Sequence, residues 1–372
     1  MKKKIVVLAG TRPEAIKLAP VILELKRRAS LFTTLICASG QHDEMFYQAL
    51  ADFEIIPDND LKVMRPGQSL AGVTARLFEA IDSFLEREQP DWVLVQGDTT
   101  TAMVGAMCSF YRKVKVGHVE AGLRSHQRFA PFPEEVNRRV VSIIADKHFA
   151  PTIGAKQNLI REGVCDADIL VTGNTVVDAL LWMVERVRKV QPPIPQNVLD
   201  AVSSGKRMIL VTGHRRESFG SGFEQICLAI LELVHMHKDV VFVYPVHLNP
   251  NVREPVIRLL GNYERVLLID PSTYKSFAWL MDRSAFILTD SGGIQEEAPS
   301  LGKLVLVMRG VTERPEGVES GTSLLVGSDR NQIVKGVTSV LNRLSDKRFV
   351  PIQSNPYGDG LAASRIVQAL SS

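Results

Sequence analysis

The sequence lacks any hydrophobic run long enough to cross a membrane. Among its 372 residues, no stretch approaches the roughly 18 uncharged apolar residues that a spanning helix needs. A short apolar run, IVVLA, follows the lysines at 2–4 and superficially resembles a secretion signal. It ends before Arg12, short of the roughly 7–15 residues of a signal core. We therefore expect this run to form a buried first strand, and we expect no membrane partner.

Charge of one sign and paired cysteines are also scarce. The 44 Lys and Arg residues against 41 Asp and Glu residues leave a net charge of +3, too weak a bias to favour a nucleic-acid or membrane partner. The four cysteines contain no CxxC pair, which favours reduced thiols in the cytoplasm over a disulfide framework or a zinc site. His235 and His237 lie two apart on an expected helix and so face different directions. We expect no metal site.

The length and the hydrophobic pattern predict two α/β domains. Near-continuous apolar runs alternate with segments of helical period, which indicates parallel sheets covered on both faces. One such helical stripe, Leu18, Val21, Ile22 and Leu25, lies between the first two runs. The expected strands are 4–9, 33–38, 92–96, 114–119, 168–172, 208–212, 240–244, 265–269, 285–289 and 304–308.

The two halves of the chain open alike, because the strand at 4–9 leads into GTRPE and the strand at 208–212 leads into GHRRE. We interpret them as two Rossmann-like domains that bind ligand at the carboxyl ends of their strands. The first domain is expected over 1–173 and the second over 174–360, with a C-terminal helix over 361–372 that packs back onto the first. An expected helix over 175–190, followed by a proline-rich stretch, begins the second domain.

Two polar clusters in the first half follow expected strands. Arg12 and Lys17 of GTRPEAIK stand at a helix start, where unpaired N–H groups favour an anion. The alternative is a capped helix with two solvated cations. Asp98 of QGDTTT is either a catalytic base or the N-cap of the next helix.

A third cluster joins HVEAGLR to PFPEEVNRR. Glu120 follows an expected strand, and Glu134 and Arg138 lie four apart, so they share one helical face. An exposed ion pair at this spacing is worth only about 0.3–0.5 kcal/mol. Ion pairing alone is therefore a poor reason for so many charges, and the cluster is a candidate for acid–base chemistry.

In the second half, His214 ends one expected strand and DSGGIQEE follows another. Gly292 and Gly293 at a helix start let backbone N–H groups approach a diphosphate closely. Acidic side chains one turn later can accept hydrogen bonds from ribose hydroxyls. Arg314 adds a cation after the strand at 304–308.

Seven strings together resemble the non-hydrolysing UDP-N-acetylglucosamine 2-epimerase family, in order from residue 10 to about 318: GTRPEAIKLAP, QGDTTT, GHVEAGLR, PFPEEVNRR, VTGNTVVDAL, VTGHRRES and LTDSGGIQEEAPSLGKLVLVMRGVTERPEGV. The resemblance implies an α/β fold of the glycosyltransferase-B type, with the active site in the cleft between two Rossmann-like domains. It implies no metal and no nicotinamide cofactor. The implied reaction interconverts UDP-GlcNAc and UDP-ManNAc, by anti elimination of UDP to 2-acetamidoglucal and re-addition.

The resemblance also assigns roles to residues of this sequence. The implied catalytic residues are Asp98, Glu120, Glu134 and His214. The implied substrate-binding residues are Arg12, Lys17, Arg138, Ser291, Gly292, Gly293, Glu297 and Arg314. A second UDP-GlcNAc, bound as an activator, would use Gln41, His42, Arg65 and His247. The segment 125–130 (SHQRFA) departs from the typical family pattern, which leaves the identity of the sugar open.

Other functions compatible with these motifs stay open. A 2-epimerase of a UDP-diacetamido-uronic acid would use the same chemistry, and a hydrolysing epimerase would release free ManNAc. A glycosyltransferase of the same fold gives no reason for three clustered carboxylates in the first domain. A non-catalytic UDP-sugar sensor would not need an acid–base set. We expect a homodimer, the commonest oligomer of soluble proteins.

Overall fold

The computed structural model describes residues 2–40, 44–65, 67–215, 219–346 and 354–371. The chain folds into two compact units. Unit 1 comprises Met1–Ala179 and Tyr357–Ser372, and unit 2 comprises Leu180–Pro356. The boundaries expected from the sequence were 173/174 and 360/361.

Unit 1 contains a seven-stranded parallel sheet in the order β3-β2-β1-β4-β5-β6-β7. Its strands are β1 (Lys3–Ala9), β2 (Phe32–Ala38), β3 (Asn59–Asp60), β4 (Trp92–Gln96), β5 (Lys115–Val119), β6 (Lys147–Ala150) and β7 (Ile169–Val171). Its helices are α1 (Arg12–Arg27), α2 (Glu44–Asp52), α3 (Leu70–Glu88), α4 (Thr100–Tyr111), α5 (Glu134–Ile144), α6 (Ile153–Arg161), η1 (Asp166–Asp168) and α15 (Ala362–Ser371), and α7 (Thr175–Lys189) runs from unit 1 into unit 2.

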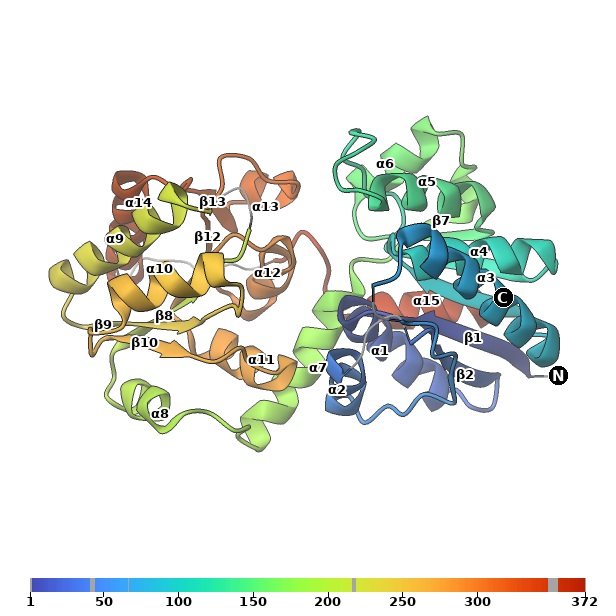
Figure 1. Cartoon of the computed structure of the whole chain (residues 1–372), viewed down its shortest axis with the longest axis horizontal. Coiled ribbons are helices and arrows are strands. Elements are labelled where there is room, and N and C mark those ends of the chain that lie inside the picture. The colour runs from blue at the N-terminus through green and yellow to red at the C-terminus, as the bar shows by residue number, and fades with distance from the viewer. Residues whose placement is uncertain (1, 41–43, 66, 216–218, 347–353, 372) are drawn as a thin grey trace. The chain divides into compact units, whose positions relative to one another are not determined.

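Two layers of helices cover the sheet of unit 1. Helix α1 packs against α2 and α15, while α4 packs against α3 and α5 (Figure 1). The strand order reverses direction between β1 and β4, and right-handed crossovers then place the helices that follow these strands on opposite faces. The expected stripe of Leu18, Val21, Ile22 and Leu25 on α1 is buried, which confirms that helix and the face it presents to the core.

The C-terminal helix α15 belongs to unit 1. Asp178 of α7 accepts hydrogen bonds from the backbone N–H groups of Ala362 and Ala363, at 3.3 and 2.8 Å, and so satisfies two donors at the start of α15. At the other end, Lys3 Nζ donates to the carbonyl of Leu370 at 3.0 Å. The chain therefore returns to the first sheet after completing the second.

Unit 2 contains a six-stranded parallel sheet in the order β10-β9-β8-β11-β12-β13. Its strands are β8 (Arg207–Thr212), β9 (Val240–Pro245), β10 (Val266–Ile269), β11 (Phe286–Thr289), β12 (Val305–Val307) and β13 (Ser323–Leu325). Its helices are α8 (Gln196–Ser203), α9 (Ser221–Met236), α10 (Pro250–Leu260), α11 (Tyr274–Arg283), α12 (Gly292–Glu297), η3 (Ala298–Leu301), α13 (Pro315–Glu319) and α14 (Arg330–Ser345). Counted from β8, the strand order is that of a Rossmann sheet, with its reversal between β8 and β11.

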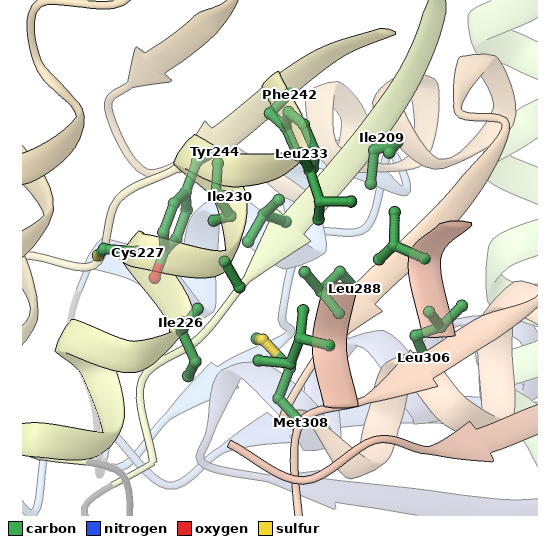
Figure 2. Close-up of a cluster of buried hydrophobic side chains, with 14 of the residues drawn as sticks. Ile209, Ile226, Cys227, Ile230, Leu233, Phe242, Tyr244, Leu288, Leu306 and Met308 are labelled. Carbon is green, nitrogen blue, oxygen red and sulfur yellow. The ribbon is translucent and has the colours of Figure 1, made fainter. Parts of the chain in front are cut away.

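The core of unit 2 lies between its sheet and the layer formed by α9, α10 and α14. Figure 2 shows Ile230 and Leu233 from α9 among Phe242, Leu288 and Leu306 from three strands. Fully burying a side chain of this size contributes about 1.5–3 kcal/mol. The Tyr244 hydroxyl of the same cluster donates to the carbonyl of Gly213 at 3.3 Å, which ties the loop after β8 to the core.

The ten strands expected from the sequence are all present, each within one residue at either end. Three further strands, β3, β6 and β13, were missed because they are two to four residues long and contain polar residues. The similar openings of the two halves are not the same turn. Helix α1 begins at Arg12, whereas α9 begins only at Ser221, so Gly213, His214 and Arg215 do not open a helix. Within the described ranges, no helix is both long and apolar enough to span a membrane.

Candidate active site

Three neighbouring strands of unit 1 bring three of the predicted motifs to one edge of the sheet. The turn at Thr11 follows β1, Gly97 and Asp98 follow β4, and Glu120 follows β5. Strand β4 pairs with both β1 and β5, with Gln96 opposite Val119. Because the strands are parallel, their carboxyl ends meet at the edge where open α/β sheets bind ligands.

Glu120 is the centre of a buried polar cluster. Its Oε1 accepts hydrogen bonds from Lys17 Nζ and from Asn174 Nδ2, the latter at 3.0 Å. Its Oε2 accepts from Gln96 Nε2. The backbone of Glu120 has a φ of +62°, a left-handed conformation that is uncommon outside glycine and that recurs at functional sites. Lys17 is thus paired with a buried carboxylate, and the interpretation of it as a solvated cation is wrong.

Asp98 forms an ion pair with Arg138 of α5. Its backbone carbonyl accepts a hydrogen bond from Asn137 Nδ2 at 2.9 Å. The N-cap of α4 is the next residue, Thr99, whose hydroxyl accepts from the N–H of Ala102 at 3.0 Å. The alternative interpretation of Asp98 as a helix cap is therefore wrong.

Gly97 makes the turn between Gln96, which donates to Glu120, and Asp98. Its φ of +67° favours glycine, and its carbonyl accepts a hydrogen bond from His118 Nε2 at 2.8 Å. Burial lowers the pKa of His118 to about 3, so the ring is neutral near pH 7 and donates through Nε2. The sequence offered no signal for this contact, because a histidine within a strand has many other uses.

Glu134 and Arg138 do not pair, although they lie on one helix. Within the described residues the carboxylate of Glu134 has neither a hydrogen bond nor an ion pair. Arg138 instead pairs with Asp98, and its Nη1 lies 3.4 Å from Oε2 of Glu135. Glu134 is half-buried at the start of α5, which leaves its carboxylate available to a ligand.

Of the adjacent glutamates 134 and 135, Glu135 is the buried one, and the sequence motifs predicted no role for it. Its carboxylate accepts from the backbone N–H groups of Ser125 and His126, at 3.0 and 3.2 Å. Burial alone would raise the pKa of Glu135, but the Ser125 N–H and the guanidiniums of Arg138 and Arg139 together lower it. Glu135 thus fixes the start of the segment 125–130.

Arg12 occupies the first position of α1 and is half-buried. Its guanidinium has no hydrogen bond or ion pair within the part of the chain that the structure describes. The position next to a helix N-terminus favours a bound anion. Arg12 is therefore free to bind one, whereas Lys17 on the same helix is engaged with Glu120.

In unit 2, buried Asp290 joins the loops that follow β8 and β11. Its Oδ2 accepts from the backbone N–H groups of His214 and Arg215, both at 2.8 Å. The His214 ring is stacked on that of His247, with centroids 5.5 Å apart and an interplanar angle of 15°. Burial lowers the pKa of His214 against the opposing effect of Asp290, and the neighbouring His247 and Arg215 lower it further. A neutral ring near pH 7 is the consequence.

Gly292 of the SGG segment lies near two guanidinium groups. Helix α12 begins at Gly292, and Ser291 makes no side-chain cap bond to it. A Cβ atom on Gly292 would lie 3.8 Å from Cζ of Arg314 and 4.0 Å from Nη2 of Arg215. Backbone N–H groups without side-chain bulk, flanked by two cations, suit a phosphate group.

The two acidic residues that end α12 have different partners. Arg314 Nε bonds to Glu296, which is buried. The predicted site residue, Glu297, accepts instead from the Tyr274 hydroxyl at 2.8 Å. Sequence reasoning missed Glu296 and Tyr274, although the run QEE did indicate acidic groups one turn into the helix.

The four residues expected to bind an activator are only partly described. Gln41 and His42 lie outside the described residues. Arg65 is exposed in unit 1, and His247 is the stacking partner of His214 in unit 2. Over the described ranges, no three His, Cys, Asp or Glu side chains are grouped so as to hold a metal ion.

Comparison with known proteins places these motifs in one family. The sequence model of the family described as UDP-N-acetylglucosamine 2-epimerase matches residues 23–371. The UDP-N-acetylglucosamine 2-epimerase of Escherichia coli K12 is 51% identical over 370 residues, which cover 99% of this chain and 98% of that protein.

Solved structures agree with the sequence comparison. The Neisseria meningitidis UDP-GlcNAc 2-epimerase bound to UDP-GlcNAc is 45% identical, with a TM-score of 0.87 and 99% of each chain covered. The Methanocaldococcus jannaschii enzyme in complex with UDP-GlcNAc and UDP is 34% identical, with a TM-score of 0.79 and 99% of each chain covered. The fold, the motifs at the strand ends and these full-length matches agree, and the chain belongs to the UDP-N-acetylglucosamine 2-epimerase family.

Proposed function

We propose that this chain is a 2-epimerase that interconverts UDP-GlcNAc and UDP-ManNAc. The observation that carries the proposal is the set of carboxylates at the ends of β4 and β5, with Glu120 and Asp98 each paired with a cation. A transferase or a sensor has no use for such a set, whereas a reaction that removes and returns a proton requires it. Relatives named UDP-N-acetylglucosamine 2-epimerase match the chain over nearly its full length, and they support this substrate.

The chemistry of the sugar dictates the order of events. The C2 proton is too weakly acidic for a carboxylate to remove directly. Departure of UDP from C1, with the electron pair of the C1–O bond, builds positive charge on the ring and acidifies C2–H. Removal of that proton gives 2-acetamidoglucal. Re-addition of UDP to C1, with protonation of C2 from the other face, then gives the epimer.

Unit 1 supplies the acid–base groups in this proposal. Glu120 and Asp98 follow neighbouring strands, and Glu134 begins α5 with a carboxylate that binds no other described side chain. A proton leaves C2 from one face of the sugar and returns to C2 from the other face, which needs more than one proton donor or acceptor. General acid–base help of this kind contributes about 10²–10⁴-fold to rate.

Unit 2 supplies the groups for UDP. The backbone N–H groups of Gly292 and Gly293, with Arg314 beside them, are placed to hold a diphosphate, and His214 adds a neutral ring at the end of β8. The same donors stabilise the charge that develops on the leaving diphosphate. Ser291, which directly precedes the two glycines, adds a hydroxyl group to this site. Arg12 of unit 1 is proposed as a further cation for the diphosphate. The Glu297 carboxylate is the acceptor proposed for the ribose hydroxyls.

Replacement of Glu297 tests the nucleotide site. Glu297→Gln is expected to raise the dissociation constant of UDP about tenfold, because a charged acceptor is exchanged for a neutral one. Isothermal titration with UDP alone measures this. Tyr274→Phe is the matched control: it removes the hydroxyl that donates to Glu297 but leaves the charge, and UDP affinity should change by less than about threefold. Equal losses in the two variants would mean that Glu297 acts only on the protein.

A time course in heavy water tests the function as a whole. With UDP-GlcNAc and the wild-type chain, ¹H NMR is expected to show UDP-ManNAc that carries deuterium at C2, with EDTA present and no nicotinamide added. Steady accumulation of free ManNAc and UDP would identify a hydrolysing epimerase instead. Turnover of a UDP-diacetamido-uronic acid, with none of UDP-GlcNAc, would overturn the substrate but keep the mechanism.

The proposal extends to regulation and assembly. The Methanocaldococcus jannaschii structure contains UDP-GlcNAc and UDP together, which supports a second UDP-GlcNAc as an activator of this chain, bound through Gln41, His42, Arg65 and His247. We propose a cytoplasmic homodimer, in keeping with the unpaired cysteines and with the commonest oligomer of soluble proteins.

A further inference from the structure

Glu14 is a carboxylate buried in the first turn of α1, with 1% of its surface exposed. A glutamate at this helical position often reaches back to the N-cap backbone from solvent. Here Oε2 accepts from the N–H groups of Gly10 and Thr11, at 3.0 and 2.7 Å, and from the Thr11 hydroxyl at 2.8 Å. Burial raises the pKa of Glu14, against the hydrogen bonds that favour the charged form. A helix cap alone is a weak reason to bury an acid so completely.

The second oxygen of Glu14 reaches another loop. Oε1 accepts from the Thr99 hydroxyl at 2.6 Å. Thr99 Oγ1 itself accepts from the N–H of Ala102, at 3.0 Å, so its proton is directed to Glu14. Glu14 therefore joins the turn after β1 to the turn after β4, across the point where the strand order of the sheet reverses.

Each of these turns presents a residue of the proposed reaction. Asp98 directly precedes Thr99, and Lys17 lies one helical turn beyond Glu14, where it pairs with Glu120. Glu14 itself accepts four hydrogen bonds, and a carboxylate has about four acceptor positions. Both oxygens are engaged and only 1% of the residue's surface is exposed, so Glu14 is not a candidate acid or base.

We propose that Glu14 is a positioning residue of the epimerase reaction, which holds the Asp98 turn and the Lys17–Glu120 pair in register through Thr99 and the β1–α1 turn. The inference rests on the proposed function. Catalytic groups must be held to within about half an ångström of their working geometry. A misplacement of about 1 Å costs on the order of 10²-fold in rate.

The test is the Glu14→Gln variant, assayed for UDP-GlcNAc epimerisation. The glutamine amide has the same shape, but its NH₂ group must face either the Thr99 hydroxyl or the donors of Gly10 and Thr11. At least one of the two turns therefore loses its hydrogen bond to residue 14. We expect kcat to fall about tenfold or more, with KM and the dissociation constant of UDP within about threefold of wild type. The shape of the kcat–pH profile should be unchanged, because Glu14 transfers no proton.

Thr99 provides matched variants. Thr99→Val removes the hydroxyl and should lower kcat by about the same factor, while Thr99→Ser keeps the hydroxyl and should restore kcat to within about twofold of wild type. The double variant Glu14→Gln/Thr99→Val should be no slower than the slower single variant, because both residues act through the same link between the two turns. Asp329→Ala removes the N-cap of α14 in unit 2 and controls for the loss of a helix cap. It should lower the melting temperature and leave kcat unchanged.

The outcomes separate this inference from the function on which it rests. A wild-type chain without epimerase turnover would overturn the proposed function. An active wild type with wild-type kcat in Glu14→Gln, or a rise in KM at constant kcat, would overturn the positioning role alone. If Glu14→Gln does not fold, the Thr99→Val and Thr99→Ser pair decides: equal kcat values in these two variants would also overturn the role.

Discussion

Glu120→Gln is expected to lower kcat by on the order of 10² or more and to lower the melting temperature as well. The first effect follows from the loss of a carboxylate that exchanges a proton with C2. The second follows from burial, because Lys17 then faces a neutral amide, and removing one partner of a buried ion pair destabilises a protein by about 3–5 kcal/mol. Steady-state kinetics and thermal melts, measured on the same preparation, record both effects.

A double variant separates the two consequences. In Lys17→Met/Glu120→Gln the cation that faced Glu120 is removed as well, so the melting temperature should recover relative to Glu120→Gln, because a neutral pair of similar volume is often as stable as a buried ion pair. The catalytic loss should remain. Recovery of kcat together with stability would show that Glu120 acts as a structural ion-pair partner, and it would remove Glu120 from the proposed chemistry.

The hydrophobic pattern was sufficient to predict the fold. Strands buried on both faces must be almost wholly apolar, so runs such as 92–96 and 240–244 stand out from their surroundings. Strand β6 (Lys147–Ala150) contains a lysine and a histidine in four residues, and so it lacks that signature. It exists because β5 and β7 flank it, which is tertiary information that a local pattern does not contain.

The sequence also predicted that the site residues lie together at one edge of the sheet, but it did not predict which side chains bind each carboxylate. Parallel strands end at one edge, which is enough to bring Glu120 near Asp98. The partners of each carboxylate lie far along the chain: Lys17 reaches Glu120 across 103 positions, and Glu14 reaches Thr99 across 85. No local rule selects one lysine or one threonine at such separations.

Adjacent residues of the same type were a second source of error. Both Asp98 and Thr99 are good N-cap residues, and a shift of one position in the start of α4 decides which of them caps the helix. Likewise Glu134 and Glu135 both lie within reach of Arg138 by sequence spacing, and the face that α5 buries decides that Glu135 is the partner.

Asp98→Asn is expected to lower kcat by on the order of 10² or more while stability stays within about 1 kcal/mol of wild type. The asparagine side chain keeps an oxygen that accepts from Arg138, the backbone carbonyl still accepts from Asn137, and Thr99 still caps α4. The ion pair is also partly solvated, with 30% of the Asp98 side chain exposed, so weakening it changes the free energy of unfolding little. What disappears is the ability to take up a proton.

Asp82→Asn is the matched control for this change. Asp82 forms a bidentate ion pair with Arg112, with both N–O distances at 2.6 Å, and lies on α3 away from the strand ends. The same substitution there weakens an Asp–Arg pair without touching the proposed site, so kcat should stay at the wild-type value. Equal kcat losses in the two variants would mean that any weakened ion pair in unit 1 slows the enzyme. A loss confined to Asp98→Asn, with unchanged melting temperature, assigns the effect to proton transfer, because the geometry that holds Asp98 is preserved.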